Sequence, residues 1–158
     1  MFWPIIAFVI GLPCLTSTLT AADAPTKVGA QYVDALKKDD LAKAISLSAR
    51  FTKLADEEME RLTTKVAAAL KSKPMTILVE PSKILEDCAV VIGKQSEIDL
   101  DPVYLLKQGD QWRVLPTITR YDHQSFELSE AQQARFLELK TWFKEKRAEN
   151  YKKVNGAK

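Results

Sequence analysis

The chain has 158 residues and carries 23 basic and 21 acidic side chains, giving a formal net charge of +2. Residues 23–122 hold 15 basic and 16 acidic side chains, whereas residues 123–158 hold eight and five, so the positive excess lies in the C-terminal segment. The main body therefore lacks the cationic surface that neutralises many phosphates, which argues against a nucleic-acid-binding protein. A chain of this length can bury enough apolar surface to fold as one domain.

The first 22 residues contain no charged side chain. The apolar run 2–15, followed by small residues at 20–24, is typical of a cleaved secretory signal and predicts an exported protein of the periplasm or the extracellular space. An uncleaved membrane anchor is the alternative, but two prolines and the polar stretch 16–18 interrupt the run before it reaches a spanning length. Lipidation of Cys14 is not expected, because the residues before it are not the small ones that precede a lipidated cysteine.

Once this signal is removed, Cys88 is the only cysteine left, so no disulfide can form within the chain. Cys88 stands in the apolar run 88–92. This position predicts a small, buried side chain rather than a reactive thiol.

Helical periodicity dominates residues 26–74. A first helix is predicted over about 26–37, with Ala30, Val33 and Leu36 on its apolar face. A short helix through 41–47 follows, with Asp39 or Asp40 as its N-cap. A third helix is predicted with Asp56 as its cap and with apolar positions between 59 and 70, and Pro74 ends it.

From residue 75 the pattern changes to short runs of β-branched and aromatic residues, which predict strands over 76–79, 88–92, 103–106 and 112–118. The last two form a hairpin if Gly109 and Asp110 make a two-residue turn in which the glycine supplies a positive φ. In this register Gln108 faces Gln111, Leu105 faces Val114 and Val103 faces Pro116. Alternation then places one group of side chains on one face (Val103, Leu105, Trp112 and Val114) and a second on the other (Tyr104, Leu106 and Leu115). Both faces are apolar, so cover is expected on each.

The C-terminal segment begins with the capping box Ser129-Glu130-Ala131-Gln132. A long amphipathic helix is predicted to follow it. Its apolar side consists of Leu128, Phe136, Leu139, Trp142 and Phe143.

The segment 36–44 (LKKDDLAKA), the strand 102–106 (PVYLL), the turn at Gly109 and the strand 112–116 (WRVLP) together resemble the nuclear transport factor 2-like superfamily, which includes SnoaL-like and ketosteroid-isomerase-like proteins. The resemblance covers about residues 26–120 and is nearest to small exported members of unknown function. It implies a cystatin-like α+β fold, with N-terminal helices packed on a curved, cone-like antiparallel sheet, often dimeric and often with a cavity. The long C-terminal helix departs from the short exported members. The resulting domain prediction is a signal peptide over 1–22, an α+β domain over 23–125, and an amphipathic helix with a basic tail over 126–158.

Catalytic members of the superfamily use a carboxylate base and a hydroxyl donor inside the cavity. No such pair can be named from this sequence, so no catalytic residue is assigned. Tyr32, Tyr104 and Trp112 are the candidates for lining a ligand cavity, with ordinary core packing as the alternative.

His123 and a group of three carboxylates are the other polar candidates for chemistry. His123 is the only histidine, but its neighbour Asp122 would point to the opposite side of an extended chain and cannot readily orient it. A solvated histidine in a connecting segment is therefore predicted.

Glu97, Asp99 and Asp101 alternate and so present three carboxylates on one side, as in a calcium site. A calcium loop of the helical-hand type needs glycine and glutamate where this chain has Pro102 and Gln108. We interpret the three carboxylates as the solvated edge of a strand, with the intervening apolar residues pointing inward. No metal and no cofactor are predicted.

The C-terminal helix also offers a candidate partner surface, because Lys140, Lys144 and Arg147 recur beside its apolar side. Its glutamates argue against a membrane surface. The sequence thus favours an exported, non-catalytic binding or assembly module of the cell envelope, with an envelope protein or a small apolar ligand as its partner and a homodimer as an open alternative. The rival interpretation is a cavity enzyme of the isomerase or hydrolase kind, distinguished by a carboxylate that faces Tyr32 or Tyr104 within a pocket.

Overall fold

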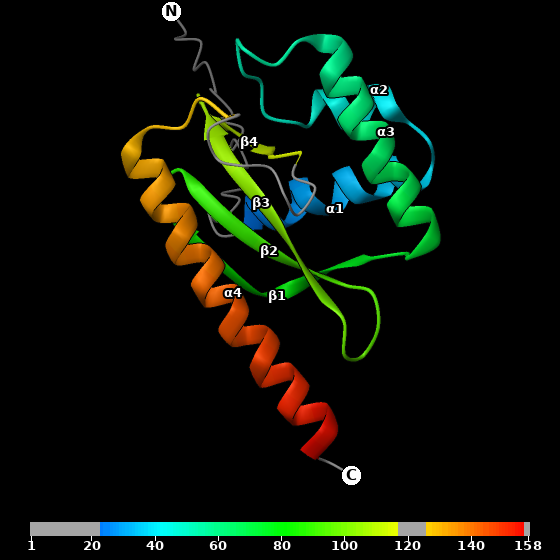
Figure 1. The fold of residues 1–158 in the computed structure, drawn as a ribbon, viewed down its shortest axis with the longest axis vertical. Coiled ribbons are helices and arrows are strands. Elements are labelled where there is room, and N and C mark those ends of the chain that lie inside the picture. Colours follow the sequence, from blue (N-terminus) through cyan, green and yellow to red (C-terminus); the bar gives the residue numbers. More distant parts are fainter. Residues whose placement is uncertain (1–22, 117–125, 157–158) are drawn as a thin grey trace, which may run out of the picture.

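The computed structural model describes residues 23–116 and 126–156. Three helices precede a four-stranded antiparallel sheet and a long helix follows it, which confirms the predicted α+β class and the C-terminal helix (Figure 1). In chain order the elements are α1 (Asp23–Lys37), α2 (Leu41–Ser46), α3 (Asp56–Ser72), β1 (Thr76–Leu85), β2 (Cys88–Lys94), β3 (Leu100–Gln108), β4 (Gln111–Val114) and α4 (Glu130–Gly156). The predicted signal segment 1–22, together with Asp122 and His123, lies outside the described residues.

Helix α1 buries a stripe with helical spacing, formed by Gly29, Tyr32, Val33 and Leu36. The prediction that Ala30 belongs to this face is wrong: Ala30 is exposed, because it is rotated about 100° from Gly29 on the helix. A Cβ atom on Gly29 would lie 2.9 Å from a methyl group of Val91, so the glycine allows α1 to approach β2 closely.

The predicted N-cap of α2 is confirmed, whereas the predicted N-cap of α3 is wrong. Asp40 caps α2, and its carboxylate accepts a hydrogen bond from the Lys43 amide at 3.1 Å. Asp56 does not cap α3, since it is the first helical residue and the N-cap position is held by Ala55 without a side-chain bond. Asp56 and the two glutamates that follow it instead place negative charge at the positive end of the helix.

The strands form a simple meander in the order β1-β2-β3-β4. The predicted hairpin register is confirmed, because Gln108 pairs with Gln111 and Leu105 with Val114, and Gly109 has a φ of +60°. Strand β4 ends at Val114, short of the predicted Val103–Pro116 pair. Its outer edge is covered by the segment 47–49, whose backbone bonds to both the amide and the carbonyl of Val114.

Both faces of the sheet are buried, as the hairpin pattern predicted. Side chains of β2 illustrate the alternation: Ala89 and Val91 pack with α1, whereas Cys88 and Val90 pack with α4. The buried position predicted for Cys88 is confirmed. Helix α1 and the α2–α3 pair therefore cover one face, and α4 covers the other (Figure 1).

Helix α4 begins with the predicted capping box. The Gln132 amide donates to the Ser129 hydroxyl at 3.2 Å, and the Ser129 amide donates to the Gln132 side chain at 3.0 Å. The predicted apolar side is also confirmed, with Phe136, Leu139 and Phe143 buried. In the part of the chain that the structure describes, none of the helices has the length and apolarity needed to span a bilayer.

Candidate functional site

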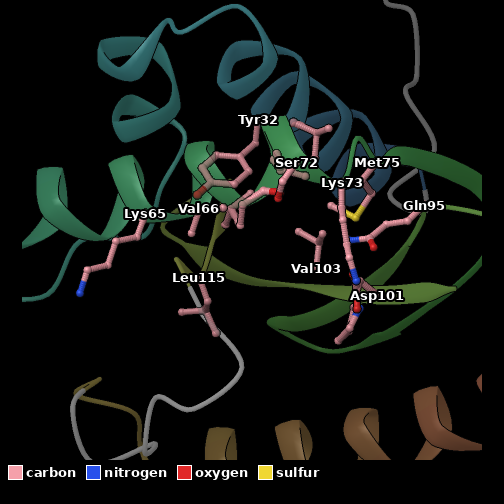
Figure 2. Close-up of a pocket in the computed structure, with 15 residues that line it drawn as sticks. Tyr32, Lys65, Val66, Ser72, Lys73, Met75, Gln95, Asp101, Val103 and Leu115 are labelled. Carbon is pink, nitrogen blue, oxygen red and sulfur yellow. The ribbon is translucent and has the colours of Figure 1, made fainter.

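A pocket of about 270 Å³ lies between α1, α3 and the sheet face that these helices cover (Figure 2). Its lining is mainly aliphatic. The apolar side chains come from every element around it: Val33, Val66, Ala69, Leu70, Met75, Pro102, Val103, Val114 and Leu115.

The pocket exists because α3 packs mainly on α1 and α2 rather than on the sheet. On the side of the pocket that α3 forms, the C-terminal half of the helix offers the small side chain of Ala69 and the half-buried Val66. Neither is long enough to close the gap. Met75 lies over Gly93 of β2, where a Cβ atom would come within 1.9 Å of its sulfur, so the glycine makes room for this part of the wall.

Tyr32 places a hydroxyl in the wall of the pocket. Its side chain is 4% exposed, and the hydroxyl oxygen makes no hydrogen bond to any described residue. The Ser48 hydroxyl lies close enough to Tyr32 to lower its pKa, but it donates to the Ala44 carbonyl at 2.9 Å and makes no hydrogen bond with Tyr32. Burial raises the pKa of Tyr32 to about 12, an effect that Ser48 only partly offsets. Tyr32 is thus a neutral donor without an acceptor, an arrangement that is unfavourable in a protein interior.

Asp101 supplies the only carboxylate in the described wall of the pocket. It shares a face of β3 with Val103 and Leu105, because alternate residues of a strand point to the same side. One of its oxygens accepts a hydrogen bond from the Gln95 side chain at 2.5 Å. The prediction that Asp101 belongs to a solvated edge with Glu97 and Asp99 is therefore wrong.

The reason is a turn that separates these carboxylates. Residues 95–99 form a turn in which the Gln95 amide donates to the Asp99 carbonyl and the Asp99 amide donates to the Ser96 hydroxyl. Strand alternation begins only at Leu100, so Asp101 turns to the pocket while Glu97 and Asp99 remain exposed. Ile98, expected to point inward, is exposed as well.

Ser72, whose hydroxyl donates to the Ala69 carbonyl at 2.8 Å, and two lysines complete the lining. The lysines are Lys65 of α3 and Lys73 at its C-terminal cap. Both are exposed, and neither forms an ion pair within the described ranges. Figure 2 shows the Tyr32 hydroxyl and Lys65 toward one end of the pocket, and Asp101, Gln95 and Lys73 toward the other. The pocket therefore has an apolar middle and two polar ends.

Of the three aromatic residues proposed from the sequence, only Tyr32 lines this pocket. Trp112 is buried in the core on the same side of the sheet. Tyr104 points to the opposite side, where its ring meets Phe136 of α4 edge-on with centroids 6.0 Å apart. Burial raises the pKa of Tyr104 to about 12. The structure does not bring the three aromatic side chains together.

The basic residues proposed as a partner surface lie on α4. Lys144 and Arg147 are exposed, and Lys140 is half-buried. Leu137 and Tyr151, which are 64% and 58% exposed, stand on the same helix. Figure 1 shows that the last turns of α4 extend past the sheet.

Among residues 23–116 and 126–156, no group of three or more His, Cys, Asp or Glu side chains is placed to hold a metal ion. Comparison of the chain with protein-family profiles, with curated proteins and with solved structures found no match. Function must therefore be argued from the geometry of the pocket.

Proposed function

We propose that this protein is an exported, non-catalytic binding module of the cell envelope, and that its pocket holds a small, mainly apolar molecule. The observation that carries the proposal is the hollow under α3, which is lined by aliphatic side chains and contains the unpartnered hydroxyl of Tyr32. Pockets of this kind, apolar with a few placed polar groups, are typical of small-molecule sites. Export is supported by the uncharged apolar segment at the N-terminus.

The volume limits the size of the ligand. A cavity of roughly 150 Å³ in another protein accommodates benzene, so about 270 Å³ suits a molecule of about ten non-hydrogen atoms. Naphthalene has about this size and is fluorescent, which makes it a suitable neutral probe.

Two neighbouring alanines of α3 allow a matched test. Ala69 lines the pocket, whereas Ala68 is exposed and does not. We expect Ala69→Phe to weaken naphthalene binding at least about tenfold, because the ring occupies the volume of the ligand, and Ala68→Phe to bind like the unmodified protein. Equal binding by all three proteins would exclude the pocket as the site.

We also propose that the chain is a divergent member of the nuclear transport factor 2-like superfamily, with the curved, cone-like sheet that this membership implies. The order of elements supports this proposal, since helices precede an antiparallel meander and a pocket lies between them. The four described strands form an uncurled sheet, so the cone is not seen in the part of the chain that the structure describes. Crystals of the exported protein would test the proposal, and a sheet that stays uncurled there would argue against it.

A cavity enzyme is the second candidate, favoured by the presence of Asp101 and Tyr32 in one pocket. A carboxylate base and a hydroxyl donor must reach the same reacting group, whereas Figure 2 places these two side chains toward opposite ends. We therefore expect no protein-dependent exchange of the α-hydrogens of cyclohexanone with D₂O. Exchange that is abolished in Asp101→Asn would identify a catalytic base.

If the binding module also has a protein partner, we propose that the partner contacts the exposed part of α4 through Lys144 and Arg147. Charge reversal at both positions should weaken capture of that partner in a salt-dependent way and leave naphthalene binding unchanged. If the variant captures the partner as well as the unmodified protein does, α4 is not the partner surface.

A further inference from the structure

We infer that the ligand of the pocket is an apolar acid, whose carboxylate lies at the end formed by Tyr32 and Lys65 and whose hydrocarbon part fills the aliphatic middle. This inference rests on the proposed binding function and adds the chemical class of the ligand and its direction in the pocket.

The hydroxyl of Tyr32 indicates that the ligand carries a hydrogen-bond acceptor. It is buried, lies in the pocket wall and has no hydrogen-bond partner among the described residues. A phenol that stays neutral at physiological pH is a donor, and its missing partner is an acceptor oxygen. A carboxylate oxygen is the stronger choice, because hydrogen bonds to a charged acceptor are shorter and stronger than those to a neutral one.

The charge of Lys65 favours an anionic ligand. Lys65 lines the pocket and, within the described part of the chain, has no anionic partner, whereas Lys71 on the same helix is paired with Asp39 at 2.8 Å. A carboxylate that binds Tyr32 would lie toward the end of the pocket where Figure 2 shows Lys65. The flexible lysine chain can then supply a countercharge at the solvent edge.

The charges at the two ends of the pocket set the direction of the ligand. Asp101 lies toward the end opposite Tyr32, where it is bonded to Gln95 and where the Lys73 side chain also extends (Figure 2). At that end the positive charge of Lys73 is offset by the negative charge of Asp101, whereas the described wall at the Tyr32 end carries Lys65 and no carboxylate. An acid placed with its carboxylate beside Asp101 would meet a like charge, so the Tyr32 end is the more favourable place for the carboxylate.

The test compares three compounds with the same chain length, measured by calorimetry or by NMR shifts: sodium octanoate, 1-octanol and octylammonium chloride. Octanoate has about ten non-hydrogen atoms and so matches the volume. We expect octanoate to bind at least about fivefold more tightly than 1-octanol and at least about tenfold more tightly than octylammonium. Equal or tighter binding of 1-octanol or of octylammonium would overturn the assignment of an acid.

Variants locate the carboxylate. Tyr32→Phe should weaken octanoate binding about five- to twentyfold, yet leave the urea midpoint of the ligand-free protein unchanged or higher, because it removes a buried hydroxyl that has no partner. Lys65→Gln should weaken octanoate binding about two- to fivefold and reduce its salt dependence. Lys152→Gln, at an exposed position of α4 on the far side of the sheet, is the matched charge control and should change neither property.

Two outcomes separate this inference from the proposed function. If Tyr32→Phe lowers the urea midpoint and binds octanoate as tightly as the unmodified protein, the hydroxyl is structural and the inference is wrong. If naphthalene binds in an Ala69-dependent way but octanoate does not bind, the acid is again excluded while the binding function stands. If naphthalene also fails to bind, the proposed function itself is excluded.

Discussion

At the scale of single residues, burial suppresses the acid–base chemistry of three groups. It raises the pKa values of Tyr32, Tyr104 and Cys88 to about 12 in each case, and the negative charge of Asp87 contributes further at Cys88. Each group is therefore neutral in the folded protein at physiological pH. A neutral thiol is a poor nucleophile, and a neutral tyrosine hydroxyl can donate a hydrogen bond but does not act as a base.

This burial predicts a loss of stability at alkaline pH. The thiol of an unfolded chain ionises near its ordinary pKa of 9.0, whereas Cys88 in the folded chain does not. The stability that the buried, neutral thiol contributes is fully present below the ordinary pKa of 9.0, and it is lost as the pH rises toward about 12. The free energy of unfolding, measured by urea titration, should therefore decrease from about pH 8 to about pH 10. In Cys88→Ala this decrease should be smaller. Parallel pH profiles for the two proteins would show that another group is responsible.

Trp112 provides a test of the core on the helix-covered face of the sheet. It is 9% exposed and packs in the same cluster as Leu105 and Val114. Trp112→Ala should lower the free energy of unfolding by about 3–5 kcal/mol, the usual cost of deleting a large buried aromatic side chain. Val79, which is 75% exposed, is the control, and Val79→Ala should change stability by less than about 0.5 kcal/mol. A loss below about 1 kcal/mol for Trp112→Ala would contradict the packing described here.

At the scale of elements, the attachment of α4 depends on a polar cluster as well as on its apolar side. Asp87, in the β1–β2 turn, accepts hydrogen bonds from Arg135 at 2.9 Å and from Gln132 at 2.8 Å. Burial alone would raise the pKa of Asp87, but these two residues and the Cys88 thiol outweigh it and hold the pKa below its usual value. The turn and the first turns of the helix are thereby connected across about 45 residues of sequence.

Breaking this cluster should loosen α4 in a pH-dependent way. Arg135→Met should lower the free energy of unfolding by about 1–2 kcal/mol near neutral pH, since Arg135 is only 24% exposed and Asp87 loses a charged donor. The contribution of Asp87 is present above the ordinary pKa of 3.8 and is lost as the pH falls through its lower folded value. The variant should therefore lose less stability on acidification than the unmodified protein.

A second ion pair of α4 is the control for this measurement. Lys146 pairs with Glu149 three residues further along the same helix, so this ion pair does not connect α4 to another element. Lys146→Met should change the free energy of unfolding by less than about 0.5 kcal/mol. If both methionine variants behave alike, the contact of Arg135 with the turn does not stabilise the docked helix.

At the scale of the whole molecule, α4 covers a face of the sheet that would otherwise expose a large apolar surface. Residues of that face, including Val90 and Leu106, pack against Phe136 and Leu139. The last buried side chain of α4 is Phe143, and beyond it Asn150 donates to the Glu97 carbonyl at 2.9 Å. The helix thus has an essential N-terminal half and a C-terminal half that is held more lightly.

Truncation should separate the two halves. A chain ending at Lys144 should unfold cooperatively, with a loss of about 1–2 kcal/mol, because it gives up a hydrogen bond and few apolar contacts. A chain ending at Glu127 should lose cooperative unfolding or aggregate, since one whole face of the sheet becomes exposed. Denaturant titration followed by near-ultraviolet circular dichroism would distinguish them. Cooperative unfolding of the shorter chain would show that α4 is dispensable for the fold.

The features that the sequence by itself determined are those encoded by neighbouring residues. The hairpin register follows from Gly109, whose positive φ is intrinsic to the turn, and the start of α4 follows from Ser129 and Gln132, which bond to each other. The two apolar faces of the sheet follow from alternation along β3 and β4. In each case the determining contacts lie within a few residues or across one turn, so local chemistry is sufficient.

Only the tertiary structure decided where the site lies. The face that Asp101 occupies depends on where β3 begins, and the turn at 95–99 sets that start through its own hydrogen bonds. Tyr32 and Tyr104 have similar apolar surroundings in the sequence, but α1 carries one to the pocket and α4 covers the other. The pocket itself arises because α3 stands away from the sheet, and the aliphatic residues that line such a gap have the same periodicity as residues that fill a core. Periodicity reports which side of an element is apolar, whereas the distance between two packed elements is set by all of their contacts together.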